Sequence, residues 1–241
     1  MSEIKLNGRL CSAASFVRQR AVLADIGTDH AYLPIFLAER RIIERAVASD
    51  INEGPLKKAE ENIKSSGLSD KIECTLTNGA KALAGRGITD YTVCGMGGEL
   101  IAEIVECADH LKDKNIRLIL QPMSKQAHLR KYLQEAGFSI IAEAYSSDAG
   151  KDYLCLACEF SGERREISDM DAELPTKGVP LSGRESMKRY YLSKLNSFAR
   201  AAEGKKKGFE DASDELSLIE KIKELIALVE KECADSFTIK N

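Results

Sequence analysis

Short apolar runs and amphipathic stripes alternate along the first 160 residues of the chain. A short apolar run is typical of a buried parallel strand, and apolar residues spaced three and four apart are typical of a helix that packs on a sheet. The pattern predicts strands at 21–26, 46–49, 71–76, 91–94 and 117–120 and helices at 32–39, 56–66, 99–107 and 125–135. This alternation predicts a Rossmann-like α/β domain over residues 1–160.

Two further strand-like runs, at 138–144 and 153–160, are joined by the polar sequence S-S-D-A-G-K. A polar connection of this length that contains Gly is typical of a β-hairpin. We therefore expect a mostly parallel sheet with one antiparallel strand at its edge.

The hydrophobic pattern changes at residue 161, after which no strand is predicted. Apolar stripes at helical spacing cover 187–202 and 218–229, on either side of E-G-K-K-K-G. We expect an antiparallel, coiled-coil-like helical hairpin that forms a second domain over residues 161–241. Its first arm, 183–207, holds two Glu and eight cations, which are Arg184, Lys188, Arg189, Lys194, Arg200, Lys205, Lys206 and Lys207. Such a run fits either a solvated helix face or an RNA-binding surface.

The overall composition narrows the classes of protein. A net charge of -3 gives no global sign of a nucleic-acid partner, so any such surface must be local. The seven Cys are scattered through apolar segments, as in a reduced, cytoplasmic protein. Cys155 and Cys158 lie three apart in a predicted strand and therefore point to opposite faces, which argues against a metal site. No signal peptide and no apolar stretch of about 18 residues is present, so we expect no membrane association.

Polar and Gly residues collect at the carboxyl ends of the predicted strands. In a doubly wound sheet these ends meet at one edge, where ligands bind. The residues are Asp25-Ile26-Gly27, Asp50, Asn78-Gly79, Gly95-Met96-Gly97-Gly98 and Gln121-Pro122. Together they predict a cofactor site.

The turn after the first strand indicates which cofactor binds. A dinucleotide loop, G-x-G-x-x-G, brings a pyrophosphate against bare backbone, whereas here Gly27 is followed by side chains that include the Asp29 carboxylate. The methyltransferase motif, acidic-x-Gly-x-Gly-x-Gly, keeps its first half in Asp25-Ile26-Gly27, with Asp29 and Ala31 in place of the later glycines. The zwitterionic end of S-adenosylmethionine tolerates such a carboxylate.

The remaining strand ends fit the same donor. Asp50, 23 residues after Gly27, would accept the ribose hydroxyls, and Asn78-Gly79 would contact the adenine ring. Separately, Asp25 is also explained as a structural hydrogen-bonding group, Asp29 and Asp50 as helix caps, and His30 as a packed side chain. Only a shared site explains their joint placement.

These motifs resemble the bacterial tRNA (adenine(22)-N1)-methyltransferase family, the TrmK family. The likeness rests on D-I-G-T-D-H-A-Y-L-P (25–34), Asp50, G-M-G-G (95–98), L-I-L-Q-P (118–122) and the appended helical hairpin. It implies S-adenosylmethionine as methyl donor, tRNA as partner and methylation of adenine N1. It also implies that Asp29 is the catalytic acid and that Gly27, Asp50, Asn78, Gly79, Gly95, Met96 and Gly97 surround the donor. Met123 departs from the family pattern, which has Asn after Gln-Pro.

Adenine N1 carries an in-plane lone pair, so the enzyme must supply position and negative charge. We expect Asp29, oriented by His30 or Tyr32, to face the exocyclic amino group, and Tyr32 or Met96 to supply an apolar or stacking surface against the base. Arg9, on a predicted N-terminal amphipathic helix, and the arm cations Arg184, Lys188, Arg189 and Lys194 are candidate tRNA contacts. A small-molecule methyltransferase and a non-catalytic RNA-binding protein with a relic cofactor fold remain as alternatives.

Overall fold

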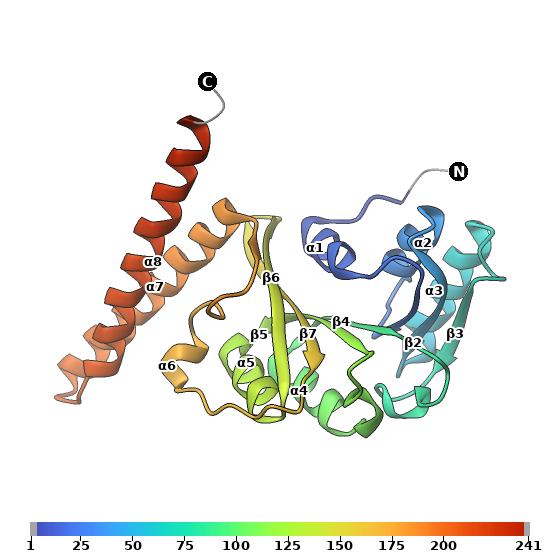
Figure 1. The fold of residues 1–241 in the computed structure, drawn as a ribbon, viewed down its shortest axis with the longest axis horizontal. Coiled ribbons are helices and arrows are strands. Elements are labelled where there is room, and N and C mark those ends of the chain that lie inside the picture. Colours follow the sequence, from blue (N-terminus) through green and yellow to red (C-terminus); the bar gives the residue numbers. More distant parts are fainter. Residues whose placement is uncertain (1–3, 239–241) are drawn as a thin grey trace.

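A computed structural model describes residues 4–238, with side chains described to residue 231. Its centre is an eight-stranded sheet with the order β3-β2-β1-β4-β5-β7-β6-β8 (Figure 1). The strands are β1 (Ala21–Ile26), β2 (Ile43–Asp50), β3 (Ile72–Leu76), β4 (Asp90–Gly97), β5 (Arg117–Ser124), β6 (Phe138–Asp148), β7 (Lys151–Phe160) and β8 (Leu181–Ser182). The predicted mostly parallel Rossmann-like sheet is confirmed, because β3, β2, β1, β4 and β5 pair in parallel.

The antiparallel strand of the sheet is β7, and it occupies an interior position. It pairs antiparallel with β5 on one side and with β6 on the other. The hairpin prediction is confirmed, but the predicted edge position of the antiparallel strand was wrong. The chain turns back after β6, so that β7 pairs with β5 and β6 lies farther out in the sheet. Two-residue β8 then adds to β6 in parallel. It is too short to leave a periodic signal in the sequence, which is why no strand was expected after residue 161.

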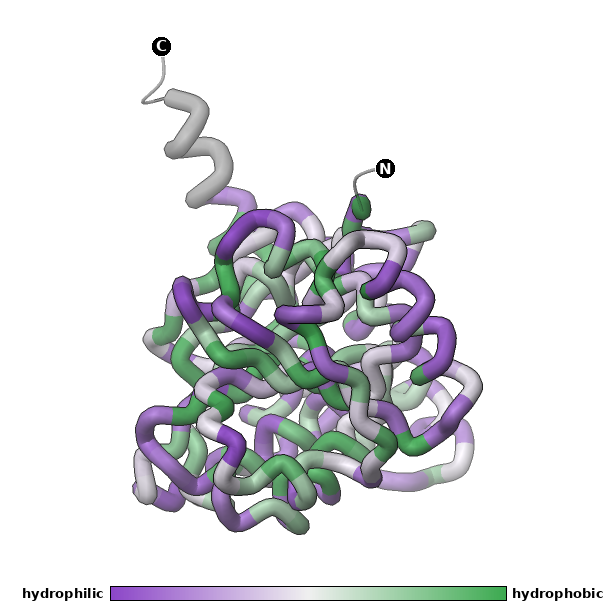
Figure 2. Tube along the Cα trace, turned by 90° about the vertical axis from the view of Figure 1, so that its right-hand side faces the viewer, coloured by the Kyte–Doolittle hydropathy of each residue, from purple (hydrophilic) through white to green (hydrophobic). Residues whose placement is uncertain are grey.

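Helices cover both faces of the sheet. They are α1 (Gly8–Phe16), α2 (Tyr32–Glu39), α3 (Glu53–Ser65), α4 (Gly98–Glu106), α5 (Gln126–Glu135), α6 (Asp169–Ala172), α7 (Arg184–Lys207) and α8 (Ser213–Thr238), with 3-10 turns η1 (Lys81–Leu83) and η2 (Asp109–Leu111). Helices α1, α2 and α3 contribute to one buried cluster, and α4, α5, α7 and α8 contribute to a second. A third, smaller cluster lies in the hairpin, and its members are Ala202, Ala212 and Ile219. Figure 2 shows the hydrophobic segments mostly inside this arrangement. Cys155 and Cys158 belong to different clusters, as their spacing predicts.

The helical hairpin of α7 and α8 continues the core of the sheet at its base. Met187, Tyr190 and Tyr191 of α7 are buried in the same cluster as the sheet residues, while the far end of the hairpin extends away from the sheet (Figure 1). The antiparallel hairpin agrees with the prediction. The boundary between residues 160 and 161 stays a prediction, and residues 239–241 of the predicted second domain lie outside the described part.

A buried ion pair lies where the hairpin meets the sheet. Arg130 of α5 and Glu143 of β6 are 1% exposed, and their Nη2 and Oε2 atoms lie 2.8 Å apart. Glu143 also accepts hydrogen bonds from Tyr145 and from Thr176, in the segment before α7, and the Tyr145 hydroxyl lies 3.2 Å from that of Tyr191. Glu143 is therefore held by α5 and by the segment before α7, and Tyr145 lies beside Tyr191 of the hairpin.

The helices and the ionisable side chains of residues 4–238 bear on the predicted absence of membrane and metal. Between residues 4 and 238, no helix has both the length and the apolar character needed to cross a membrane. Nor does this part of the chain bring together three His, Cys, Asp or Glu side chains in a way that would hold a metal ion.

Candidate active site

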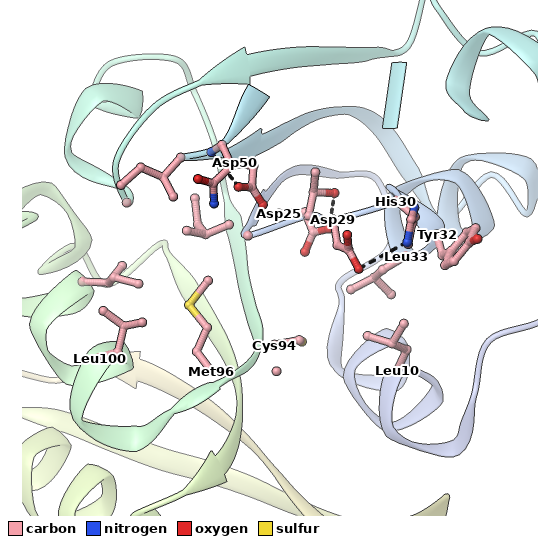
Figure 3. Close-up of a pocket in the computed structure, with 18 of the residues that line it drawn as sticks. Leu10, Asp25, Asp29, His30, Tyr32, Leu33, Asp50, Cys94, Met96 and Leu100 are labelled. Atoms are coloured by element: carbon pink, nitrogen blue, oxygen red, sulfur yellow. Dashed lines mark hydrogen bonds and ion pairs between the residues drawn. The ribbon is translucent and has the colours of Figure 1, made fainter. Parts of the chain in front are cut away.

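A cavity of about 560 Å³ lies at the carboxyl ends of β1, β2 and β4, with α1 on its far side (Figure 3). It brings together eleven of the predicted site residues, which are Arg9, Asp25, Gly27, Asp29, His30, Tyr32, Asp50, Asn78, Gly79, Gly95 and Met96. Gly97 is not part of the lining. It lies at the start of α4, where an added Cβ would stand 3.4 Å from the Ser124 hydroxyl, so its role at the donor stays a prediction.

Asp25 forms the floor of the site at the end of β1. Because β1 lies between β2 and β4, the Asp25 carboxyl is only 5% exposed, and it accepts hydrogen bonds from Thr92 (2.6 Å) and Thr28 (2.7 Å). Burial raises the pKa of Asp25, and the two hydroxyls and the Arg9 charge oppose that rise. Neither threonine was predicted as a site residue, since nothing in the sequence marks Thr92 as the neighbour of Asp25.

The backbone of the first turn explains the altered glycine motif. Gly27, Asp29 and Ala31 all have left-handed conformations, with φ of 71°, 52° and 57°. These are the three positions at which the methyltransferase motif carries glycine. The chain therefore keeps the glycine-type turn and places side chains on it, which is strained for Ala and better tolerated by Asp. Asp29 gains a fixed position at the cavity through this turn.

Asp29 and His30 form a pair at the mouth of the cavity. The Asp29 Oδ2 and His30 Nε2 atoms lie 3.5 Å apart, with the Asp29 side chain 68% exposed. The His30 ring lies 5.2 Å from that of Tyr32, centroid to centroid, and its Nδ1 atom is buried with no hydrogen-bond partner in the described part of the chain. Figure 3 shows the two side chains directed toward each other, with Leu10 of α1 below them. An acidic group, an imidazole and a phenol therefore meet where a substrate would enter.

The other half of the cavity combines an acid with apolar side chains. Asp50 is 9% exposed, and its Oδ1 atom accepts a hydrogen bond from the Asn52 amide (2.8 Å). Ile51 and Leu100 line the cavity yet remain 59% and 47% exposed. Sequence reasoning missed both, although an apolar residue directly after the strand-end Asp50 is a signal that could have indicated Ile51.

Arg9 reaches this cavity from α1. Its Nη1 atom donates to the Gln121 Oε1 atom (2.9 Å), which also accepts the Gly95 amide (3.2 Å). Gln121 is 1% exposed, so the contact lies deep at the end of β5. Met123 is 43% exposed and is not part of the lining, and its sulfur lies 3.8 Å from Gln121 Nε2.

The four predicted cations of the arm, Arg184, Lys188, Arg189 and Lys194, do not line the cavity. Arg189 donates to Asp152 (3.2 Å) and to Ser147 (2.8 Å), Lys188 pairs with Glu230, and Lys194 pairs with Glu173. Burial lowers the pKa of Lys194, with Glu173 opposing the shift. The tRNA contacts of these four residues stay predictions, and three of the side chains already have acidic partners within the chain.

The fold and the site define a Rossmann-like methyltransferase. The doubly wound sheet has an acidic turn after β1 and a second acid at the end of β2. Side chains occupy the place where the pyrophosphate of a dinucleotide would lie. The model of a family described as "Methyltransferase domain" matches residues 6–156. The tRNA (adenine(22)-N(1))-methyltransferase of Bacillus subtilis (strain 168) is 36% identical over 170 residues, which cover 70% of this chain and 71% of that protein. The chain belongs to the tRNA (adenine(22)-N(1))-methyltransferase family, which confirms the resemblance in its sequence.

Solved structures agree with this assignment. The crystal structure of Streptococcus pneumoniae Sp1610 in complex with S-adenosyl-L-methionine superposes with a TM-score of 0.75 at 35% identity, covering 90% of this chain and 98% of that one. The structure of the B. subtilis M1A22 tRNA methyltransferase TrmK gives a TM-score of 0.71 at 26% identity, with 95% and 99% covered. The shared fold thus includes the helical hairpin as well as the sheet.

Proposed function

We propose that this chain transfers the methyl group of S-adenosylmethionine to N1 of adenine 22 in tRNA. One observation carries the proposal: the cavity joins the Asp29-His30 pair to the buried acids Asp25 and Asp50 in a chain of this family. Transfer to tRNA also agrees with a cytoplasmic location.

The residues present fit the donor. A volume of about 560 Å³ suits a ligand of this size. Asp50 has one carboxylate oxygen that the Asn52 amide does not occupy, which suits a ribose hydroxyl. Ile51 and Leu100 offer apolar faces to an adenine ring, with Asn78 at its edge. Asp25, at the floor of the turn, supplies negative charge toward the amino-acid end.

When bound, S-adenosylmethionine supplies an electrophilic methyl group on a sulfonium sulfur. The protein has to align adenine N1 with that methyl group and to stabilise the positive charge that forms on the base. Asp29, at the mouth, accepts a hydrogen bond from the exocyclic amino group of the adenine and carries the compensating charge. His30, 3.5 Å from the Asp29 carboxylate, orients it.

The target base has to leave any pairing or stacking before it enters the cavity, because N1 lies on its pairing edge. Tyr32 is 42% exposed at the entrance and is tilted against the His30 ring, so it offers a surface on which the base stacks. Met96, on the opposite wall, supplies an apolar contact. Cations of the α7 arm then bind the phosphates of the tRNA around the target.

Methylation of total tRNA with labelled S-adenosylmethionine, followed by mapping of the modified nucleotide, tests the proposal. Label at adenine 22 supports it, and label at another position or no label contradicts it. A small-molecule methyltransferase would bind the donor but no tRNA in a filter assay. A non-catalytic RNA-binding protein would bind tRNA but show no thermal shift with S-adenosylmethionine.

A further inference from the structure

The turn between α7 and α8 exposes an aromatic side chain. Phe209 is 99% exposed, whereas the other large apolar side chains exposed among the described residues reach at most 59%. A ring in this position forgoes the burial that stabilises other aromatic residues. Its whole surface is therefore open to contact with another molecule.

The backbone of the turn fixes the position of Phe209. This residue has a φ of 59°, in the left-handed region that disfavours side chains with a Cβ. Gly208, one residue earlier, has an ordinary φ of -84°, so the chain places the aromatic residue, and not the glycine, at the unfavourable position. The Phe209 amide donates to the Lys206 carbonyl oxygen (3.2 Å), and the Glu210 amide donates to that of Lys205 (2.9 Å). The point at which the ring leaves the hairpin is thus set by hydrogen bonds.

The ring stays outside the small core that lies behind the turn. The third cluster, which consists of Ala202, Ala212 and Ile219, packs the two arms of the hairpin together here. The Lys205 Nζ atom of α7 also lies 2.7 Å from the Glu215 Oε1 atom of α8. Phe209 is not part of this cluster. The tip of the hairpin is therefore held together by other residues, and packing within the described chain does not account for an aromatic residue at this position.

Positive charge lies on the α7 side of the ring. Three lysines (205–207) end α7, and Arg200 lies about two turns earlier. Lys206 and Arg200 form no ion pair in the part of the chain whose side chains are described. The pair of Lys207 with Glu203 is 75% and 66% exposed, so it contributes little and can exchange for a phosphate. Proteins hold unpaired nucleotides with such a combination, because the cations contact phosphates and the ring stacks on a base.

Acidic side chains follow the ring, and two of them are engaged within the hairpin. The Asp211 carboxylate accepts hydrogen bonds from the amide (2.9 Å) and the hydroxyl (2.8 Å) of Ser213, at the start of α8. Glu215 is paired with Lys205. Opposite charges thus lie on the two sides of the ring, and a phosphate backbone would pass along the α7 side.

We infer that Phe209 stacks on an unpaired base of the tRNA, with Lys206 on a neighbouring phosphate, as a contact separate from the one at the methylated adenine. The inference rests on the proposed function for the identity of the RNA. Figure 1 shows the turn at the far end of the hairpin, away from α1, which lines the cavity. Helix α7 has 24 residues and is about 36 Å long, so the turn reaches a part of the tRNA remote from the target. The loops of a folded tRNA present unpaired bases, whereas its paired stems offer no free base to a ring.

Binding of a tRNA transcript to matched hairpin variants tests this assignment. We expect Phe209→Ala to weaken binding about 5- to 100-fold, as for the loss of one base stacked on an aromatic ring. Phe209→Trp keeps a ring and should bind as the wild type does, whereas Phe209→Leu, which is apolar but has no ring, should bind as weakly as the Ala variant. Leu228→Ala, at a 55% exposed position of α8, is the matched control and should leave the affinity unchanged.

Further readouts separate stacking from charge and from folding. Phe209→Ala removes no cation, so the slope of log affinity against log salt should stay the same, whereas Lys206→Ala should reduce it by about 1. Phe209→Gly relieves the left-handed turn, so it should unfold at the same or a higher urea concentration than the wild type and still bind tRNA as weakly as Phe209→Ala. A duplex RNA without loops offers no base to stack on, so the Phe209 variants should bind it as the wild type does.

Several results would overturn the inference. Unchanged tRNA affinity of Phe209→Ala, or equal weakening toward tRNA and duplex RNA, would exclude a stacked base, and full affinity of Phe209→Leu would indicate a general apolar contact. A dimer in sedimentation, or binding to phosphatidylglycerol vesicles, that is lost in Phe209→Ala while tRNA affinity is unchanged would assign the ring to a second copy or to a lipid surface. Binding is measured without the donor. A wild type that binds no tRNA would overturn both proposals, whereas a chain that methylates another nucleotide would fail the proposed function and still pass this test.

Discussion

The cavity and the α7 arm differ in how their charged side chains are paired. In the cavity, three aspartates lie close together, and the Asp29 carboxylate is 68% exposed toward the opening. In the arm, Lys194 and Arg189 are paired with Glu173 and Asp152 of neighbouring segments. Like charges gathered in a cavity require a ligand to balance them, whereas charges already paired within the chain have a structural role that needs no partner. The clustered acids of the cavity therefore belong to the donor site, and the paired cations of the arm support the fold.

The largest effect is expected at the base of the arm, from Glu143→Gln. This change leaves the buried Arg130 charge without its partner, and breaking such a pair costs about 3–5 kcal/mol. Urea denaturation should show a loss of that order in the free energy of unfolding, with Glu135→Gln, on the exposed side of α5, unchanged. A loss below about 1 kcal/mol would mean that the junction does not hold the hairpin.

The same pair has a predicted pH dependence. Burial acts to raise the pKa of Glu143, but the Arg130 charge and the Thr176 hydrogen bonds outweigh burial and hold the pKa below its ordinary value of 4.5. A carboxyl group with a lowered pKa stabilises the fold above its unfolded pKa and loses that contribution as the pH falls through its folded pKa. The stability difference between the wild type and Glu143→Gln should be constant at neutral pH and shrink below about pH 4. A difference that persists unchanged into that acid range would exclude the ion pair as its source.

Asp29→Asn should slow methyl transfer and leave binding of S-adenosylmethionine nearly unchanged. Asn tolerates the left-handed conformation at this position, so the turn is kept while the negative charge is removed. Loss of a group that stabilises transition-state charge costs about 10²- to 10³-fold in kcat. Single-turnover methyl transfer should fall by that factor, and the Kd for S-adenosylmethionine should stay within about twofold, as for the exposed-site control Asp70→Asn. Full activity would refute the role of Asp29.

Gly27→Ala should weaken binding of the donor and leave binding of tRNA unchanged. The position has a φ of 71°, and a new Cβ would lie 2.1 Å from the Met96 methyl group, which can move aside into the cavity. We expect about tenfold weaker donor binding, equal to about 1.4 kcal/mol. Gly54→Ala, where an added Cβ meets nothing within 4 Å, is the matched control. A tRNA Kd that changes as much as the donor Kd would indicate a general loss of structure.

The smallest effects are expected within the arm, and they distinguish its two kinds of cation. Arg200 and Lys206 are exposed and form no ion pair within the described residues, so Ala at either position should lower tRNA affinity about two- to fivefold and reduce the salt dependence of binding. Lys194→Ala should instead lower the melting temperature. The reverse result, with Lys194 controlling tRNA affinity, would favour the original assignment of that residue.

The fold and the position of the site could be predicted because parallel strands bring their carboxyl ends to one edge. Once 21–26, 46–49 and 91–94 were assigned as strands, Asp25, Asp50 and Gly95 had to lie near one another. Side-chain partners could not be predicted in the same way, because they depend on contacts between distant segments. The Thr92 hydrogen bond to Asp25 spans 67 residues, and the Arg9 bond to Gln121 spans 112.

The charge that the arm offers to RNA could not be predicted from the sequence either. Its eight cations are evident from composition, but the acids that pair with them lie in other segments, such as Glu173 before the arm and Glu230 in α8. Charge counted along one helix therefore overestimates the charge that is available to RNA. Strand β8 was missed for a related reason, since a two-residue strand exists only through its pairing with β6.

The most direct test of the proposed reaction compares two tRNA transcripts that differ only at position 22, one with adenine and one with guanine. The purified protein and methyl-labelled S-adenosylmethionine are added to each, and label incorporation is measured together with the position of the modified base. Stoichiometric label is expected at N1 of adenine 22 in the first transcript and none in the second. Equal labelling of both transcripts, or no label in either from a protein that binds the donor, would contradict the proposed reaction.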